Sequence, residues 1–300
     1  MDPNVAELSV FDLSVAMVPA DGVAADLSHI ERKAKVKAYV LTPEQKPVDH
    51  LEECFTGCHL VLVPAGVPRK PGMDRADLLN INIGIAKNIV EACAKFCPEA
   101  ILGLIVNPVN SVVPAMAELY KQKGLDPMKI CGVTTLDGVR ANKFVHEITG
   151  APIETIDVPV VGGHAGATIL PLFSQDPSAS KIPEDKIEAL DKRVQDAGTE
   201  VVKAKAGKGS ATLSMAYAGA RFGSTVLSGL AGEKKTTCTY TMSSVTDLAF
   251  FTSKVTFGPK GVEEVHPLGE LSAYEKKRLD EASKQLKEEI DAGLEAFSKL

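Results

Sequence analysis

Residues 59–106 read HLVLVPAGVPRKPGMDRADLLNINIGIAKNIVEACAKFCPEAILGLIV, and this stretch decides the fold. It begins with an apolar run, His59–Val63, and ends with a second one, Ala100–Val106, each of a length typical of a buried strand. Between them, Asp77–Phe96 repeats apolar residues at helical spacing, at Leu78, Ile81, Ile85, Ile89 and Cys93. A strand, a helix and a second strand of this size predict a parallel, doubly wound sheet.

The same alternation continues on both sides of this stretch. Further strands are expected at Glu7–Asp12, Lys35–Val40 and Lys129–Thr134, and a second helix at Pro108–Gly124, which starts at proline and stops at glycine. We therefore predict an α/β fold whose residues 1–134 form a Rossmann-type dinucleotide-binding domain.

The pattern changes after about Thr135, and we predict an α+β substrate and catalytic domain in residues 135–300. Its expected elements are a helix at Val139–Thr149, short strands within Ile153–Phe173, long helices at Glu184–Ala206 and Ser210–Leu230, and strands at Thr237–Met242 and Ala249–Phe257. A capping box of Ser272 and Glu275 should open the last helix. No low-complexity linker separates the two parts, so we expect a continuous join between packed domains.

Composition argues against several classes of protein. The chain has 300 residues, 45% of them apolar and 24% charged, which is typical of a globular protein with a large core. A net charge of −6 without a long basic run argues against a nucleic-acid partner. No apolar run reaches the roughly 18 residues of a membrane span, so no membrane partner is expected. Any site for an anion must therefore be made by a few local arginines.

The cysteines and the last three residues give two further predictions. Cys54 and Cys58, like Cys93 and Cys97, do not have C-x-x-C spacing, so we predict reduced thiols and no metal site. The tripeptide Ser298-Lys299-Leu300 matches a peroxisomal address that an import receptor reads. The predicted location is a peroxisome or glycosome, or the cytoplasm if that signal is masked.

A segment rich in glycine and proline, Val63–Arg75, leaves the carboxyl end of an expected strand, where doubly wound sheets bind ligands. Gly66 and Gly72 would act as hinges. Arg69 would lie on the segment between these glycines, and Arg75 would follow the second one. The alternative is a solvated basic loop. Two arginines bracketed by glycine and proline favour a lid over a ligand.

Four other polar residues are candidates for the same site. Asn107 follows a strand and precedes proline, Asp137 and Arg140 share a helical face, and His164 lies in the glycine-lined turn Val161–Gly166. Each also has a structural explanation: a turn residue for the asparagine, a surface ion pair for Asp137 and Arg140, and a structural histidine.

Taken together, these residues fit hydride transfer from an alcohol carbon. Such a reaction needs a base for the hydroxyl proton, and histidine titrates in the right range. A carboxylate behind the histidine fixes its tautomer, and arginines bind carboxylates and polarise carbonyls. The set therefore describes a site for a 2-hydroxy acid that has a second carboxylate.

Several longer stretches carry a family resemblance: AGVPRKPGMDRADLLNINIGI, NPVNS, GVTTLDGVRAN, PVVGGHAGATILPLFSQ and KGSATLSMAYAGARF. In these stretches, and over essentially its whole length, the chain resembles the NAD-dependent malate dehydrogenases of the mitochondrial and bacterial type. The resemblance implies reversible hydride transfer between L-malate and oxaloacetate with NAD, a homodimer, and a place in malate metabolism and the tricarboxylic acid cycle.

The resemblance also implies a role for each matching residue. His164 would be the proton acceptor with Asp137 as its partner, Arg140 would bind the C1 carboxylate, Arg75 would polarise the carbonyl, and Arg69 would bind the distal carboxylate. Asn107 would contact both substrate and cofactor, Asp12 would bind the adenosine ribose, and Asn82, Ile105 and Met215 would lie on the cofactor side. Asp12 would favour NAD over NADP because a carboxylate repels a 2′-phosphate.

The chain departs from this family at its start, where relatives have a first strand and a glycine-rich turn. In the usual strand order, their absence would leave a gap of about 10 Å between Glu7–Asp12 and His59–Val63. We therefore expect an N-terminally truncated enzyme that binds NADH weakly. One alternative is a malate dehydrogenase-like subunit or binding protein that cannot hold NAD. A second, lactate-type specificity, is opposed by Arg69.

Overall fold

The structure, a computed structural model, describes residues 2–67 and 75–300, and at Arg75 the backbone alone. The strands are β1 (Glu7–Leu13), β2 (Lys35–Leu41), β3 (Leu60–Val63), β4 (Ile101–Leu104), β5 (Ile130–Gly132), β6 (Val160–Gly162), β7 (Ile169–Pro171), β8 (Lys235–Met242), β9 (Phe250–Gly258) and β10 (Gly261–Val265). The helices are α1 (Ala20–Ser28), α2 (Pro47–His50), α3 (Glu52–Phe55), α4 (Arg75–Phe96), α5 (Val109–Gln122), α6 (Thr135–Thr149), α7 (Glu184–Ala204), α8 (Leu213–Leu230) and α9 (Ala273–Ser298). None of the helices in these ranges is long and apolar enough to cross a membrane.

One mixed sheet runs through the centre of the molecule in the order β3-β4-β5-β8-β9-β6-β7, with β10 beside β9. Its first three strands are parallel, as predicted from residues 59–106 and from the strand expected at Lys129–Thr134. The sheet then continues across an antiparallel pair, with Gly132 of β5 opposite Tyr240 of β8. The join between the two predicted domains is therefore continuous through the hydrogen bonds of the sheet.

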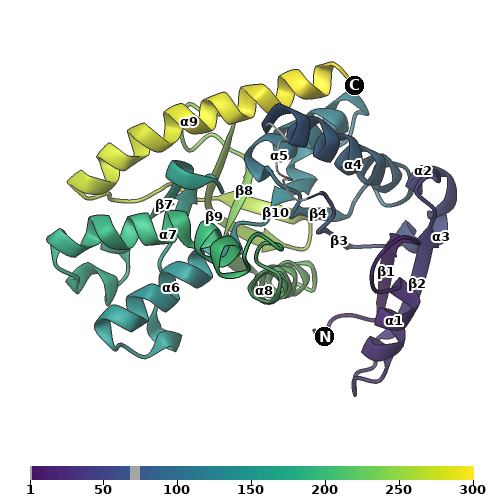
Figure 1. Cartoon of the computed structure of the whole chain (residues 1–300), viewed down its shortest axis with the longest axis horizontal. Helices are drawn as coiled ribbons and strands as arrows, with labels where there is room; N and C mark the ends of the chain where they lie inside the picture. Colours follow the sequence, from purple (N-terminus) through teal and green to yellow (C-terminus); the bar gives the residue numbers. More distant parts are fainter. Residues whose placement is uncertain (1, 68–74) are drawn as a thin grey trace.

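The strands β1 and β2 form a separate parallel sheet, with Glu7 opposite Lys35 and Leu13 opposite Leu41. Together with α1 they lie at one edge of the molecule, away from the centre of the main sheet (Figure 1). Among the described residues, no strand pairs with both β1 and β3. Phe11 and Tyr39 still pack against the main core and keep the small sheet attached.

Helices cover both faces of the main sheet, so the Rossmann-type, doubly wound prediction is confirmed. On one face, α4, α5 and α9 cover Leu102 and Leu104 of β4. On the other face, Phe222 of α8 packs with Ile101 and Phe257. Successive β4 residues thus point to opposite cores, as the two-residue period of a strand requires. This strand has no exposed residue because both of its faces are covered.

The second half has a smaller core of its own between α6, α7, β6 and β7. The last helix, α9, begins at the predicted capping box, in which Ser272 and Glu275 bond to each other's backbone. It runs along one side of the molecule (yellow in Figure 1) and contacts α5, α4, β6 and β7. This helix therefore joins both halves from a single side.

Two predictions about helices need correction. The expected apolar face of α4 is wrong at Ile81, which is 42% exposed, whereas Ile83, Ala86 and Val90 are fully buried. The buried face of α4 is rotated relative to the predicted one, because small and polar residues, including the buried Asn82, share it. Helix α6 begins at Thr135, four residues before the predicted start, and this places Asp137 in its first turn.

Candidate active site

The predicted base, His164, lies in the turn between β6 and β7. Its backbone N–H donates to Oδ1 of Asn110 at 2.8 Å. The Thr168 hydroxyl closes the turn by accepting from the Ala165 N–H at 3.0 Å and donating to the Ala165 carbonyl at 2.7 Å. Gly162, at a φ of 92°, lets the chain leave β6 in a conformation that other residues rarely adopt. The turn is therefore held at several points around the histidine.

Asp137 and His164 meet as predicted, with Oδ2 of Asp137 2.5 Å from Nδ1 of His164. The carboxylate is only 1% exposed and the imidazole 13%. Burial lowers the pKa of His164, but the Asp137 charge and hydrogen bond outweigh it and raise that pKa above its usual value, with Arg140 opposing. The pair thus has the geometry of a proton acceptor and its orienting acid.

Arg140 lies beside this pair on α6. Its Nη1 is 3.8 Å from Oδ1 of Asp137, and its side chain is 14% exposed. Burial lowers the pKa of the guanidinium, while Asp137 and Glu200 oppose that effect. Because arginine stays charged in proteins, it supplies a fixed positive charge next to the histidine. The structure therefore brings together His164, Asp137 and Arg140 from distant parts of the sequence.

Asn82 joins two loops at the edge of the main sheet. Its Oδ1 accepts from the Val67 N–H at 2.8 Å, and its Nδ2 donates to the carbonyls of Val67 at 3.3 Å and Asn107 at 2.7 Å. The side chain of Asn107 itself is exposed. Asn82 thus fixes the backbone around Asn107 and leaves the Asn107 amide accessible to a ligand.

Ile105 and Met215 lie on the α8 side of the sheet, where both pack against the same apolar cluster. They meet at Gly219, where a Cβ atom would lie 3.5 Å from Ile105 and 3.9 Å from Met215. The two residues form an apolar surface of the kind that a planar ring covers. Their predicted place on the cofactor side remains a prediction.

Asp12 lies at the carboxyl end of β1, on the small sheet. Its side chain is exposed, and Oδ1 accepts from the adjacent Leu13 N–H at 2.7 Å. An exposed carboxylate at a strand end fits the predicted contact with a ribose of NAD. Arg69 lies outside the described residues, and so does the side chain of Arg75, although its backbone opens α4.

The sequence did not single out Asn110 or Thr168 as parts of the site. Asn110 is 1% exposed and Thr168 fully buried, and Nδ2 of Asn110 donates to the Thr168 hydroxyl at 3.1 Å. The Asn110 carbonyl also accepts from the buried Tyr240 hydroxyl at 3.0 Å. Two polar residues, Asn110 and Ser111, open the otherwise apolar first half of α5, and they were the signal that could have identified Asn110.

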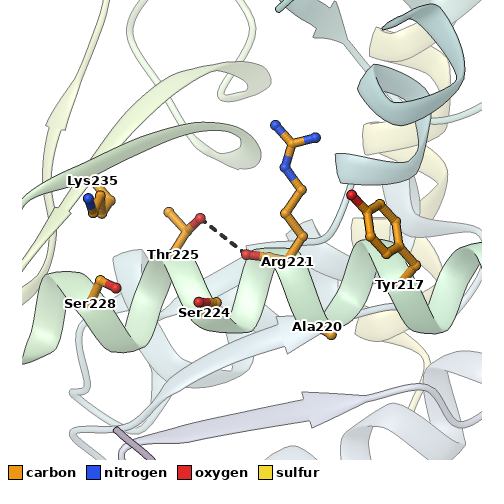
Figure 2. A pocket seen from close by; sticks show the side chains of 7 residues that line it. All are labelled: Tyr217, Ala220, Arg221, Ser224, Thr225, Ser228 and Lys235. Atoms are coloured by element: carbon orange, nitrogen blue, oxygen red, sulfur yellow. Dashed lines mark hydrogen bonds between the residues drawn. The ribbon is translucent and has the colours of Figure 1, made fainter. Parts of the chain in front are cut away.

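A second feature, an open cavity of about 360 Å³, lies along α8, the helix that also carries Met215. Figure 2 shows its lining of Tyr217, Ala220, Arg221, Ser224, Thr225, Ser228 and Lys235. None of these lining residues belongs to the predicted site. The lining of the cavity therefore does not include His164, Asp137 or Arg140. Residues 2–67 and 75–300 also contain no group of histidine, cysteine and acidic side chains suited to a metal ion.

The two halves of the chain match two family models. Residues 1–132 match the NAD-binding domain of lactate/malate dehydrogenases, and residues 134–297 match the α/β C-terminal domain of the same family. The first match identifies NAD as the cofactor of this domain. Both matches agree with the resemblance drawn from the sequence.

Similar proteins support the same assignment. Malate dehydrogenase 1, mitochondrial, of Arabidopsis thaliana is 50% identical over 98% of this chain and 84% of its own length. Malate dehydrogenase 2, peroxisomal, of the same organism is 50% identical over 100% of this chain and 82% of its own length. A solved structure of the malate dehydrogenase from Picrophilus torridus in its apo form is 25% identical, with a TM-score of 0.83 over 99% of this chain and 92% of that one. The chain therefore belongs to the lactate/malate dehydrogenase family.

Proposed function

We propose that the chain is an NAD-dependent L-malate dehydrogenase that uses His164 as its acid and base. The observation that carries the proposal is the buried contact of 2.5 Å between His164 and Asp137, with Arg140 beside it. Sequence identity of 50% with malate dehydrogenases, over nearly the whole chain, supports malate as the substrate. The same identity favours an enzyme over the alternative of a subunit without activity.

In this mechanism, His164 takes the proton of the malate hydroxyl. Because Nδ1 is bonded to Asp137, Nε2 is the nitrogen that exchanges the proton with substrate. Asp137 holds the ring and stabilises the imidazolium that forms. When bound, NAD supplies the hydride acceptor. In the reverse direction, the same imidazolium returns the proton to the carbonyl oxygen of oxaloacetate.

Charged and polar side chains hold the substrate in this proposal. Arg140 binds the C1 carboxylate, since a guanidinium forms paired hydrogen bonds with a carboxylate. Arg75 polarises the carbonyl, and Arg69 binds the distal carboxylate that distinguishes malate from lactate. Asn107 supplies a donor and an acceptor to the reacting oxygen or the cofactor.

The direct test is a steady-state assay that follows NADH oxidation with oxaloacetate. We expect turnover by the purified chain, much slower turnover with pyruvate, and none with the His164→Asn variant. A folded wild-type chain that neither binds NADH nor shows turnover would favour the alternative, a subunit or binding protein that cannot hold NAD.

We also infer delivery to a peroxisome or glycosome, a homodimer, and a role in the tricarboxylic acid cycle or related malate metabolism. Leu300 is 57% exposed, which supports reading of the terminal Ser298-Lys299-Leu300 by an import receptor. Relatives named mitochondrial and peroxisomal are similar to the same degree. Imaging of an N-terminally labelled chain with and without the tripeptide tests the location, and light scattering tests the dimer.

A further inference from the structure

Helix α9 reaches the catalytic turn from the far side through Glu289. Its Oε2 accepts from Nδ2 of Asn110 at 2.6 Å, and its Oε1 accepts from Nε2 of Gln285 at 2.7 Å. The main-chain carbonyl of Glu289 accepts from the Ser111 hydroxyl at 2.6 Å. A turn further along, a Cβ atom on Gly293 would lie 2.7 Å from the Ser111 Cα, so α9 packs directly against the start of α5.

This carboxylate is the charged group that favours one orientation of the Asn110 amide. An ionised carboxylate only accepts hydrogen bonds, so the amide must turn its NH₂ group toward Glu289. The opposite end, Oδ1, then faces the His164 N–H and accepts from it at 2.8 Å. The Thr168 hydroxyl supports the same orientation, because it donates its hydrogen to the Ala165 carbonyl and accepts from Nδ2 of Asn110 at 3.1 Å.

The amide in turn determines the position of the backbone at His164. Gly163 lies against it so closely that a Cβ atom would be 2.6 Å from Nδ2 and 2.7 Å from Oδ1 of Asn110. A reversed amide would direct its NH₂ group at the His164 N–H and force the turn away. Small displacements of a catalytic group reduce the rate strongly, since reaction needs a closely defined approach.

We propose that Glu289 is a positioning residue for His164, acting through the orientation of the Asn110 amide. The expected effect on turnover rests on the proposed function. The expected effect on the backbone at His164 rests only on the contacts described above. Glu289 touches neither His164 nor the Asp137 carboxylate in the contacts described. Its predicted effect therefore depends on the presence of Asn110.

The first experiment measures the His164 amide directly. Hydrogen exchange of the full-length chain, resolved to single residues, compares wild type with Glu289→Met, Glu289→Gln and Asn110→Ala. Methionine keeps the length of the side chain but has no carboxylate, while glutamine keeps an acceptor oxygen. We expect exchange at the His164 N–H about tenfold faster in Glu289→Met and Asn110→Ala. Glu289→Gln and the exposed neighbour control Glu288→Met should exchange like wild type.

The second experiment measures turnover in the same variants. We expect kcat about 10- to 100-fold lower in Glu289→Met, with NADH affinity unchanged, and recovery of most activity in Glu289→Gln. The double variant Glu289→Met/Asn110→Ala should be no slower than Asn110→Ala alone, because both changes remove the same constraint.

The outcomes separate this proposal from the proposed function. Exchange and kcat in Glu289→Met that match Glu288→Met would overturn the positioning role, and so would additive losses in the double variant. If wild type has no dehydrogenase activity, the proposed function fails, and the exchange comparison alone decides the positioning role. If Glu289→Met is unstable, Glu289→Ala takes its place with the same expected results.

Discussion

At the scale of single residues, the site depends on how burial and charge balance at His164. Burial alone would favour the neutral imidazole, but Asp137 at 2.5 Å favours the charged form and raises the pKa. The residue types and their order were predictable from the sequence. The contact itself was not, because it joins the start of α6 to a turn 27 positions away along the chain.

The first prediction concerns the pH dependence of malate oxidation. The oxidation needs neutral His164, so kcat/KM falls as the pH drops through a pKa that lies above the usual 6.5. Asp137→Asn removes the carboxylate, burial then dominates, and the pKa falls. The acid limb should therefore move to lower pH, while kcat drops by about 10²- to 10⁴-fold. Rate profiles between pH 5 and 9 measure the shift, and movement of the limb to higher pH would contradict the assignment.

The second prediction concerns substrate choice. Arg69→Gln removes the charge proposed to bind the distal carboxylate, so kcat/KM for oxaloacetate should fall by at least about 100-fold. Pyruvate has no distal carboxylate, and its reduction should change far less. Lys70→Gln, which removes the neighbouring charge, is the matched control. Equal losses for both substrates in Arg69→Gln would remove this residue from its specificity role.

At the scale of elements, buried polar side chains fix the loops around the site. Asn82 on α4 ties the loops that follow β3 and β4, and Arg278 on α9 binds Asp191 on α7 at 2.7 Å. The same guanidinium donates to the carbonyls of Ala167 and Ile169, just after the catalytic turn. Helical periodicity located these helices to within a few residues. It did not identify their inward-facing polar residues, because periodicity records apolar positions only.

The third prediction concerns Asn82. Asn82→Ala leaves the half-buried Val67 N–H and the Asn107 carbonyl without their partner, so we expect a loss of about 1–3 kcal/mol in the free energy of unfolding. The KM for oxaloacetate should also rise, because Asn107 loses its support. Asn88→Ala, on the exposed side of the same helix, should change neither quantity. Urea unfolding and steady-state kinetics provide the two measurements.

The fourth prediction concerns the ion pair between α7 and α9. Asp191→Ala leaves Arg278 buried without its main partner, and we expect a loss of about 3–5 kcal/mol in the free energy of unfolding. Asp291→Ala removes the partner of Lys287 in an exposed pair and should cost at most about 1 kcal/mol. Urea denaturation of both variants tests the difference. A loss for Asp191→Ala as small as that of the control would show that water reaches Arg278.

At the scale of the whole molecule, one sheet unites the two halves and a smaller sheet stands apart. The parallel strands β3, β4 and β5 were predictable from their apolar runs. Their connection to β8 was not, since β5 and β8 lie about a hundred residues apart in the chain and pair at a single position, Gly132 with Tyr240. The small helices α1–α3 and the strand β10 were also not predicted, because their apolar patterns are short.

The fifth prediction concerns local stability. The sheet of β1 and β2 has two strands and no fully buried face, so it should open at a lower free energy than the main sheet. Amide exchange within Glu7–Leu13 should therefore be faster than within Ile101–Leu104 or Phe250–Gly258. Mass spectrometry of deuterated peptides measures all three segments. Equal rates would mean that the small sheet unfolds only together with the whole molecule.

The sequence by itself determined the family, the doubly wound sheet and the residue types of the site, because strand and helix periods and local motifs are properties of neighbouring residues. Only the tertiary structure decided that Asp137, Arg140, Asn110 and Glu289 converge on the turn of His164. These residues come from three helices, α5, α6 and α9, whose approach depends on packing, as at Gly293 against Ser111. Contacts between distant segments are fixed by shape and burial, and no local pattern along the chain records them.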